Sequence, residues 1–123
     1  MENKKIKTTY RLPQDLREKL LLAVREDYGI KQKSRWVGEA IQQLLLNDIG
    51  LASVGLGEVY DQQDSSEVLL LDEATYLALE TGMTTIRRQD PLYEGVQSAV
   101  IRAAIRNRLK TRIKATNLRR GIQ

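Results

Sequence analysis

KKIKTTYRL, the sequence of residues 4–12, alternates between two kinds of side chain along its whole length. In an extended chain, successive side chains point to opposite faces, so the two faces can be written out separately. The face that can be buried carries Ile6, Thr8, Tyr10 and Leu12, and the opposite face carries Lys5, Lys7, Thr9 and Arg11. The stretch therefore predicts a β-strand with one mainly apolar face and one cationic face.

The cationic face has two interpretations that this stretch alone leaves equally open. A two-stranded ribbon with such a face fits the major groove of DNA, where its side chains can reach the base edges. An edge strand kept soluble by lysines has the same pattern, because charge is a common defence against pairing at a sheet edge.

The composition of the chain excludes several kinds of chemistry. Its 123 residues include no cysteine and no histidine, which excludes disulfides, thiolate metal sites and imidazole catalysis. No pair of carboxylates has a spacing typical of acid–base catalysis, so we expect no enzyme activity, no metal and no cofactor. The longest apolar stretches, 68–71 and 99–101, fall far short of the roughly 20 residues that cross a bilayer. We therefore expect a cytoplasmic protein with no membrane contact.

Charge is distributed unevenly along the sequence. Residues 62–99 carry two basic and seven acidic side chains, whereas residues 100–123 carry eight basic and no acidic ones. In the second segment Arg102, Arg106 and Lys110 recur every four residues, which places them along one edge of a helix. Such a row can bind phosphates, and it can equally be a solvated helix face.

The first half of the chain predicts a strand followed by two helices. Pro13 ends the strand and can start a helix, whose apolar residues recur every four positions as far as the glycine at position 29. Ser34 is expected to cap a second helix that ends near residues 47–50.

The second half shows the same order of elements. A strand is expected over residues 67–71, with Asp72 as the cap of a short helix broken near Gly82. A loop with Arg87 and Arg88 follows, and Asp90-Pro91 is expected to start a helix that ends near Ile113.

These elements predict a mainly α protein with short β-strands in two modules. The first module covers residues 1–49, a linker covers 50–66, the second module covers 67–114, and a basic tail covers 115–123. The second strand carries no cation, so residues 67–123 could instead form an unrelated helical oligomerisation domain.

The stretch from Lys5 to Leu46, KIKTTYRLPQDLREKL followed by GIKQKSRWVGEAIQQLL, resembles the ribbon-helix-helix (MetJ/Arc-type) DNA-binding family. The resemblance implies that two strands pair antiparallel and enter the major groove. It also implies base reading by the outward side chains, which here are Lys5, Lys7, Thr9 and Arg11.

The resemblance further implies phosphate contacts outside the ribbon. In this family the amino end of the second helix binds the DNA backbone. The corresponding residues are Lys33, Ser34, Arg35 and Trp36, although the Trp36 indole is expected chiefly to pack. Arg102, Arg106 and Lys110 would add further phosphate contacts.

Two such copies in one chain are similar to the tandem ribbon-helix-helix proteins of conjugative plasmids, which bind near a transfer origin. The resemblance implies sequence-specific binding of double-stranded DNA, as a transcriptional repressor or as an accessory protein of the conjugative relaxosome. It also implies self-association or pairing of the two halves. The alternative is a protein-binding module, such as an antitoxin or an assembly adaptor, whose second half docks a partner protein through the acidic segment 61–80.

Overall fold

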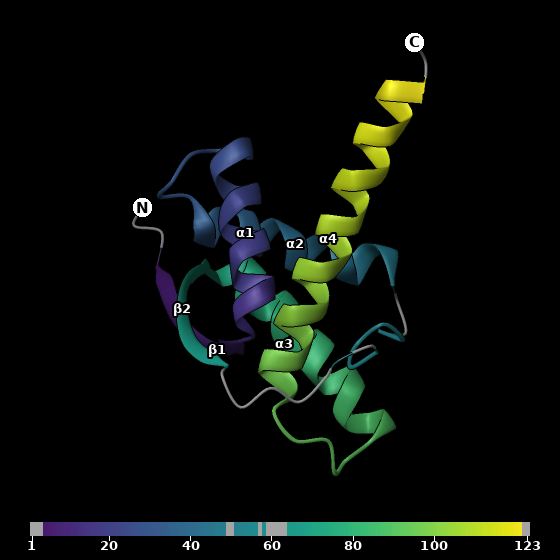
Figure 1. The fold of residues 1–123 in the computed structure, drawn as a ribbon. Coiled ribbons are helices and arrows are strands. Elements are labelled where there is room, and N and C mark those ends of the chain that lie inside the picture. The colour runs from purple at the N-terminus through teal and green to yellow at the C-terminus, as the bar shows by residue number, and fades with distance from the viewer. Residues whose placement is uncertain (1–3, 49–50, 57, 59–63, 122–123) are drawn as a thin grey trace.

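The computed structural model describes residues 4–48, 51–56, 58 and 64–121, with side chains as far as residue 113. The elements follow the order β1 (Lys5–Leu12), α1 (Gln14–Asp27), α2 (Lys33–Asn47), β2 (Ser65–Asp72), α3 (Glu73–Gln89) and α4 (Val96–Gly121). The prediction of a mainly helical protein with a short antiparallel sheet is confirmed (Figure 1). Among the helices described, none has the length and apolar character needed to cross a bilayer.

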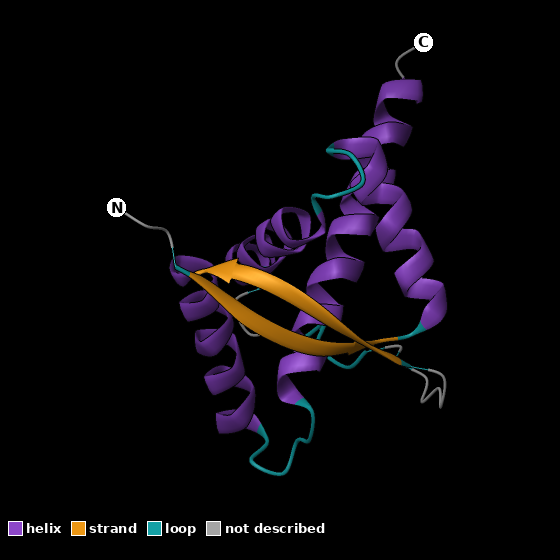
Figure 2. Ribbon diagram, turned by 90° about the vertical axis from the view of Figure 1, so that its left-hand side faces the viewer, coloured by secondary structure: helices purple, strands orange, loops and turns teal. Residues whose placement is uncertain are grey.

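The two strands pair with each other along their whole length, within one chain. Lys5 lies opposite Asp72 at one end of the ladder, and Leu12 lies opposite Ser65 at the other. Figure 2 shows this two-stranded ribbon lying across one side of the helices. The ribbon therefore has one face toward the helices and one face toward solvent.

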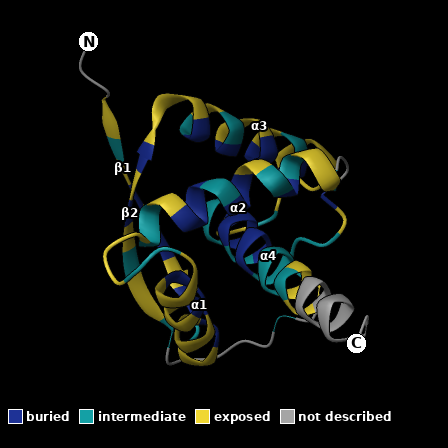
Figure 3. Cartoon of the chain, turned by 90° about the horizontal axis from the view of Figure 1, so that it is seen from above, coloured by how far each residue is buried: buried dark blue, intermediate teal, exposed yellow. Residues whose placement is uncertain are grey.

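The hydrophobic core draws on both halves of the chain. Figure 3 shows the buried residues gathered where α2 and α4 face each other. Both helices contribute side chains with no solvent exposure, spaced in the same way: Val37, Ala40 and Ile41 on α2, and Ile101, Ala104 and Ile105 on α4. Each residue of the first set is followed 64 positions later by one of the second. The two helices thus use equivalent faces to build one core.

The strands are related in a similar way. Thr9 lies opposite Val68, which follows it by 59 positions. The strand-to-helix junctions at Leu12 and Leu71 are separated by the same interval. A residue that pairs with its own equivalent lies on a local twofold axis, so such an axis passes between Thr9 and Val68.

The prediction that α3 breaks near Gly82 is wrong. The helix continues through Gly82 to Gln89 and includes the stretch expected to be a loop with Arg87 and Arg88. A Cβ at Gly82 would lie 3.1 Å from a methyl carbon of Leu45 and 3.4 Å from one of Leu51. The missing side chain therefore lets α3 approach its neighbours, which offsets the cost of about 1 kcal/mol for glycine within a helix.

The expected boundaries of α4 are also wrong. The helix begins at Val96 rather than at Pro91, and it continues to Gly121 rather than ending near Ile113. Asp90 instead ends α3, and its carboxylate accepts a hydrogen bond from the Leu92 amide at 3.1 Å. Residues 115–121 of the expected basic tail belong to α4, whereas 122–123 and residues 50, 57 and 59–63 of the expected linker lie outside the described residues.

The two helices that follow the strands begin differently. The Asp72 carboxylate accepts a hydrogen bond from the Thr75 amide at 2.8 Å, which confirms the predicted cap of α3. Pro13 precedes α1 at the equivalent position and supplies no side-chain cap. Its fixed φ of −63° still suits the start of a helix.

Candidate nucleic-acid interface

The outward face of β1 carries the four side chains that the sequence predicts there. Lys5, Lys7, Thr9 and Arg11 are all exposed, whereas Thr8, Tyr10 and Leu12 are buried against the helices. Burial, followed by the nearby Glu67 carboxylate, raises the pKa of Tyr10, so its hydroxyl stays neutral beneath the ribbon. The cationic side chains therefore project from a strand that its apolar face holds in place.

The outward face of β2 has a different composition. Its exposed residues are Ser66, Val68, Leu70 and Asp72, so β2 adds no cation to the ribbon. Asp72 lies opposite Lys5. Hydrogen bonds from Thr75 lower the pKa of Asp72, and the Lys5 charge lowers it further, so this carboxylate partly neutralises Lys5. Among the described residues, no carboxylate forms an ion pair with Lys7 or Arg11, the other two cations of the ribbon face.

The outer edge of β1 is fixed by the first turns of α4. Gln97 Nε2 donates to the carbonyl of Thr9 at 2.6 Å, and the Arg11 amide donates to the Ser98 hydroxyl at 3.0 Å. The Arg102 guanidinium donates to the Arg11 carbonyl at 3.0 Å. These bonds satisfy backbone groups that an open strand edge would leave to solvent.

The outer edge of β2 is held in the equivalent way by α2. The Leu70 amide donates to the Ser34 hydroxyl at 3.0 Å. Leu70 follows Arg11 by 59 positions, and Ser98 follows Ser34 by 64, so the two serine contacts correspond under the local twofold axis. Each strand edge therefore bonds to the amino end of the second helix from the other half.

This contact corrects the expected role of Ser34. Ser34 does not cap α2, because the helix begins one residue earlier with Gln32 as its cap, and the Ser34 hydroxyl binds β2. The Trp36 amide is also not available to a phosphate, because it donates to the Gln32 carbonyl at 3.0 Å. The amides of Lys33, Ser34 and Arg35 occupy the first turn, where helix geometry supplies no carbonyl partner. These three amides can bind an anion.

The Trp36 indole packs as expected. It has no solvent exposure, and its Nε1 donates to the Asp27 carboxylate at 2.8 Å. Burial raises the pKa of Asp27, but hydrogen bonds from Arg112 and Trp36 outweigh that effect and leave the pKa below its ordinary value. A charged carboxylate therefore holds the indole between α1 and α2.

Cations surround the amino end of α2. Lys31 and Arg35 are exposed, and Arg35 lies over the Tyr28 ring at 4.0 Å from its centroid. The Lys33 ammonium lies 3.5 Å from the Glu67 carboxylate and is partly buried. Lys31 was not among the predicted phosphate ligands, although it lies in the basic loop before the helix.

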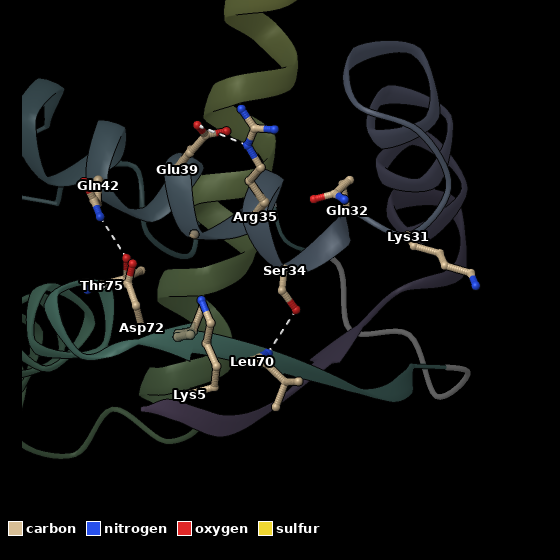
Figure 4. Close-up of a pocket in the computed structure, with 12 residues that line it drawn as sticks. Lys5, Lys31, Gln32, Ser34, Arg35, Glu39, Gln42, Leu70, Asp72 and Thr75 are labelled. Atoms are coloured by element: carbon tan, nitrogen blue, oxygen red, sulfur yellow. Dashed lines mark hydrogen bonds and ion pairs between the residues drawn. The ribbon is translucent and has the colours of Figure 1, made fainter. Parts of the chain in front are cut away.

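A groove of about 490 Å³ is lined by this amino end and by β2, beside the Ser34–Leu70 contact. Figure 4 shows Lys5 extending from β1 into the groove, with the Ser34–Leu70 hydrogen bond beneath α2 and Lys31 at one side. Cations and first-turn amides on one rim can bind a phosphate of a DNA backbone that crosses the groove.

The row of arginines on α4 is not an open cationic edge. Arg102 forms an ion pair with Glu58, and Arg106 Nη1 lies 3.3 Å from the same carboxylate. Both side chains are mostly buried in these pairs, which leaves few of their donors for a phosphate, and their phosphate contacts stay predictions. Lys110 is exposed on the same helix, and its phosphate contact stays a prediction.

Two further arginines of α4 form contacts with the first half of the chain. Arg108 donates to the Trp36 carbonyl at 2.6 Å and lies over the Trp36 ring at 4.5 Å from its centroid. Arg112 lies 3.0 Å from the Asp27 carboxylate. Their partners are more than 70 positions away in sequence, so spacing alone gave no signal for either contact.

Within the described residues, no group of three or more acidic side chains gathers to hold a metal ion. Comparison with known proteins found no match to a family model, to a curated protein or to a solved structure.

Proposed function

We propose that the chain is a tandem ribbon-helix-helix protein that binds double-stranded DNA sequence-specifically through its β-ribbon in the major groove. The observation that carries the proposal is the exposed row of Lys5, Lys7, Thr9 and Arg11 on a paired strand whose opposite face is buried. The biological role would be that of a transcriptional repressor or of an accessory protein in a conjugative relaxosome.

The dimensions and rigidity of the ribbon support this proposal. The major groove of B-form DNA admits a two-stranded β-ribbon. Hydrogen bonds to Ser98 and Ser34 hold the outer edges of β1 and β2, so the outward side chains start from a fixed backbone. A fixed backbone lowers the conformational cost of placing each side chain at a base edge.

The tandem arrangement is supported by the pairing within one chain. The order strand, helix, helix occurs twice, and the local twofold axis relates β1 to β2. Because both strands come from one polypeptide, a single chain would supply a complete ribbon.

The chemistry of each outward residue suggests its role. Lys7 and Arg11 can donate to the O6 and N7 atoms of guanine, and Thr9 can contact a base edge or a thymine methyl group. One Arg11 amino group donates to the Asp64 carbonyl at 2.7 Å, which leaves the other donors of the guanidinium for a base. Lys31, Arg35 and the first-turn amides of α2 would hold the phosphates.

The protein-docking alternative has less support. It requires available carboxylates in the acidic segment, but Glu67 is held by Arg17 and Lys33, and Asp72 caps α3. Occupation of these two carboxylates within the chain leaves fewer contacts for a basic partner, with Glu73 and Glu80 still exposed.

The direct test is selection of binding sites from a randomised DNA duplex library, followed by gel-shift titration of the selected site and of unrelated DNA. We expect Lys7→Ala and Arg11→Ala each to lower the preference for the selected site about 5-fold to 150-fold while leaving salt-sensitive non-specific binding. Lys19→Ala removes an exposed cation from α1 and serves as the matched control.

Two results would count against the proposal. An equal loss of affinity for every DNA sequence would show that Lys7 and Arg11 do not read bases. No retardation of DNA at low salt, together with stoichiometric co-purification of a protein, would favour the docking alternative.

A further inference from the structure

The exposed face of β2 has two aliphatic side chains at its centre. Val68 is 41% exposed and Leu70 is 51% exposed, and both belong to a paired strand rather than to a loop. The Leu70 amide is bound to Ser34, so the position of this side chain is fixed from its backbone. When an apolar group covers an aliphatic side chain that was exposed to solvent, the free energy of the system falls.

The neighbours of these side chains restrict what can cover them. Leu70 lies opposite Lys7, and Val68 lies opposite Thr9 on the same face. Opposed residues in an antiparallel pair are about 5 Å apart, so any partner that covers Leu70 must also accommodate the Lys7 ammonium. An apolar protein surface or a lipid core would desolvate that charge without compensation.

The major groove meets both requirements. It presents guanine acceptors and, on each thymine, an apolar C5-methyl group. We propose that Val68 and Leu70 bind thymine methyl groups, so that one chain recognises a non-palindromic site in a single orientation. This inference rests on the proposed function and specifies the DNA that the ribbon selects.

The register divides the ribbon into two unlike ends. At the end held by α2, Lys7 lies beside Leu70, which predicts a guanine contact next to a thymine methyl contact. At the end held by α4, Arg11 lies beside Ser66, so both side chains are hydrogen-bonding groups. The local twofold axis relates the backbones of the two ends, but the side chains at the two ends differ.

The amino ends of α2 and α4 also differ, in the charge of the residues around them. Lys31 and Arg35 are exposed at the amino end of α2, where Lys33 is paired with Glu67. The segment before α4 instead carries the exposed acidic residues Asp90 and Glu94. Phosphates should therefore be held more strongly beside the Lys7–Leu70 end, which strengthens the directional binding.

The test uses the selected DNA site with deoxyuridine in place of thymidine, one position at a time. This change removes only the C5-methyl group, and it leaves the protein unaltered. We expect uracil at one or two positions in the same half of the site to weaken binding by wild-type protein about fourfold each, as expected for one buried methyl group. Uracil in the other half should change the affinity little.

Protein variants then assign the effect to the side chain. At the thymine that Leu70 contacts, Leu70→Ala should bind the thymine and uracil forms equally, whereas Leu22→Ala, which shortens an exposed leucine on α1, should keep the fourfold preference. Two palindromic duplexes, each built from one half of the site, should both bind more weakly than the selected site.

The outcomes separate this inference from the proposed function. Specific binding that requires Lys7 and Arg11 but ignores every uracil substitution would overturn the methyl contacts while leaving the proposed function intact. A selected site that is palindromic would overturn the directional binding. Failure to select any site would reject the proposed function itself.

Discussion

The two halves of the chain match in what they bury and differ in what they expose. Val37, Ala40 and Ile41 of α2 have equivalents in Ile101, Ala104 and Ile105 of α4, and all are without solvent exposure. The outward residues of the strands have no such correspondence, since β1 exposes Lys7, Thr9 and Arg11 where β2 exposes Ser66, Val68 and Leu70. The shared core thus constrains the buried faces, while each exposed strand can take its own chemistry.

The largest expected effect tests whether the halves contribute equally to this core. We expect Ile41→Ala and Ile105→Ala each to lower the free energy of unfolding by about 2–5 kcal/mol, because each leaves a cavity at a site with no solvent exposure. Urea denaturation measures this free energy. Trp36 fluorescence monitors the first half, and circular dichroism monitors both halves.

Coincident transitions by the two probes are expected for both variants, since one core should unfold cooperatively. The expectation of one cooperative core would be wrong if Ile105→Ala left the Trp36 transition unchanged while part of the helical signal was lost at a lower urea concentration. That result would show that the second half unfolds independently.

A smaller effect tests a feature found in one half only. Gly82 of α3 lies within 3.6 Å of Leu45, Leu51 and Val100, when distances are taken from the position of an added Cβ. We expect Gly82→Leu to lower the free energy of unfolding by about 1–3 kcal/mol, because the larger side chain forces its neighbours apart. The melting temperature or urea midpoint measures the change.

The matched control is Thr84→Leu, which adds an aliphatic side chain at an exposed position of the same helix. It should alter the free energy of unfolding by no more than about 0.5 kcal/mol. Equal losses at positions 82 and 84 would contradict the close packing of α3 at Gly82.

The sequence predicted the elements best where the signal lies within a few residues. Alternation over residues 5–12 predicted β1 and its two faces, and Asp72 predicted the cap of α3. The predicted helix break near Gly82 was wrong, because the sequence alone does not distinguish a glycine that ends a helix from one that permits close packing. The difference depends on which side chains lie beside it in the fold.

The candidate site was predicted less completely, for a related reason. Ser34 had the composition of a cap, but its partner is the Leu70 amide, 36 residues away. Arg102 and Arg106 had the spacing of a phosphate-binding row, but both bind Glu58, more than 40 residues away. Contacts across such separations depend on the tertiary fold, which local spacing does not encode.

The smallest expected effect concerns the different starts of α1 and α3. Removing the Asp72 cap with Asp72→Ala should lower the free energy of unfolding by about 1 kcal/mol at pH 6, whereas the equivalent Pro13 supplies no side-chain cap. Hydrogen bonds from Thr75 lower the pKa of Asp72 below its value of about 3.9 in the unfolded chain. A folded-state pKa below the unfolded value means that the charged cap stabilises the protein above pH 4, and that this contribution disappears as the pH falls toward 2. Because Asp27 and Asp48 also have lowered pKa values, the difference between wild type and variant isolates the Asp72 contribution.

Asp72→Asn keeps an acceptor for the Thr75 amide without the charge, so its difference from wild type should be smaller than that of Asp72→Ala and should also shrink toward pH 2. A difference for Asp72→Ala that is equal at pH 6 and pH 2 would show that the charge of Asp72 contributes nothing, and that an uncharged hydrogen bond to Thr75 is enough to distinguish the start of α3 from that of α1.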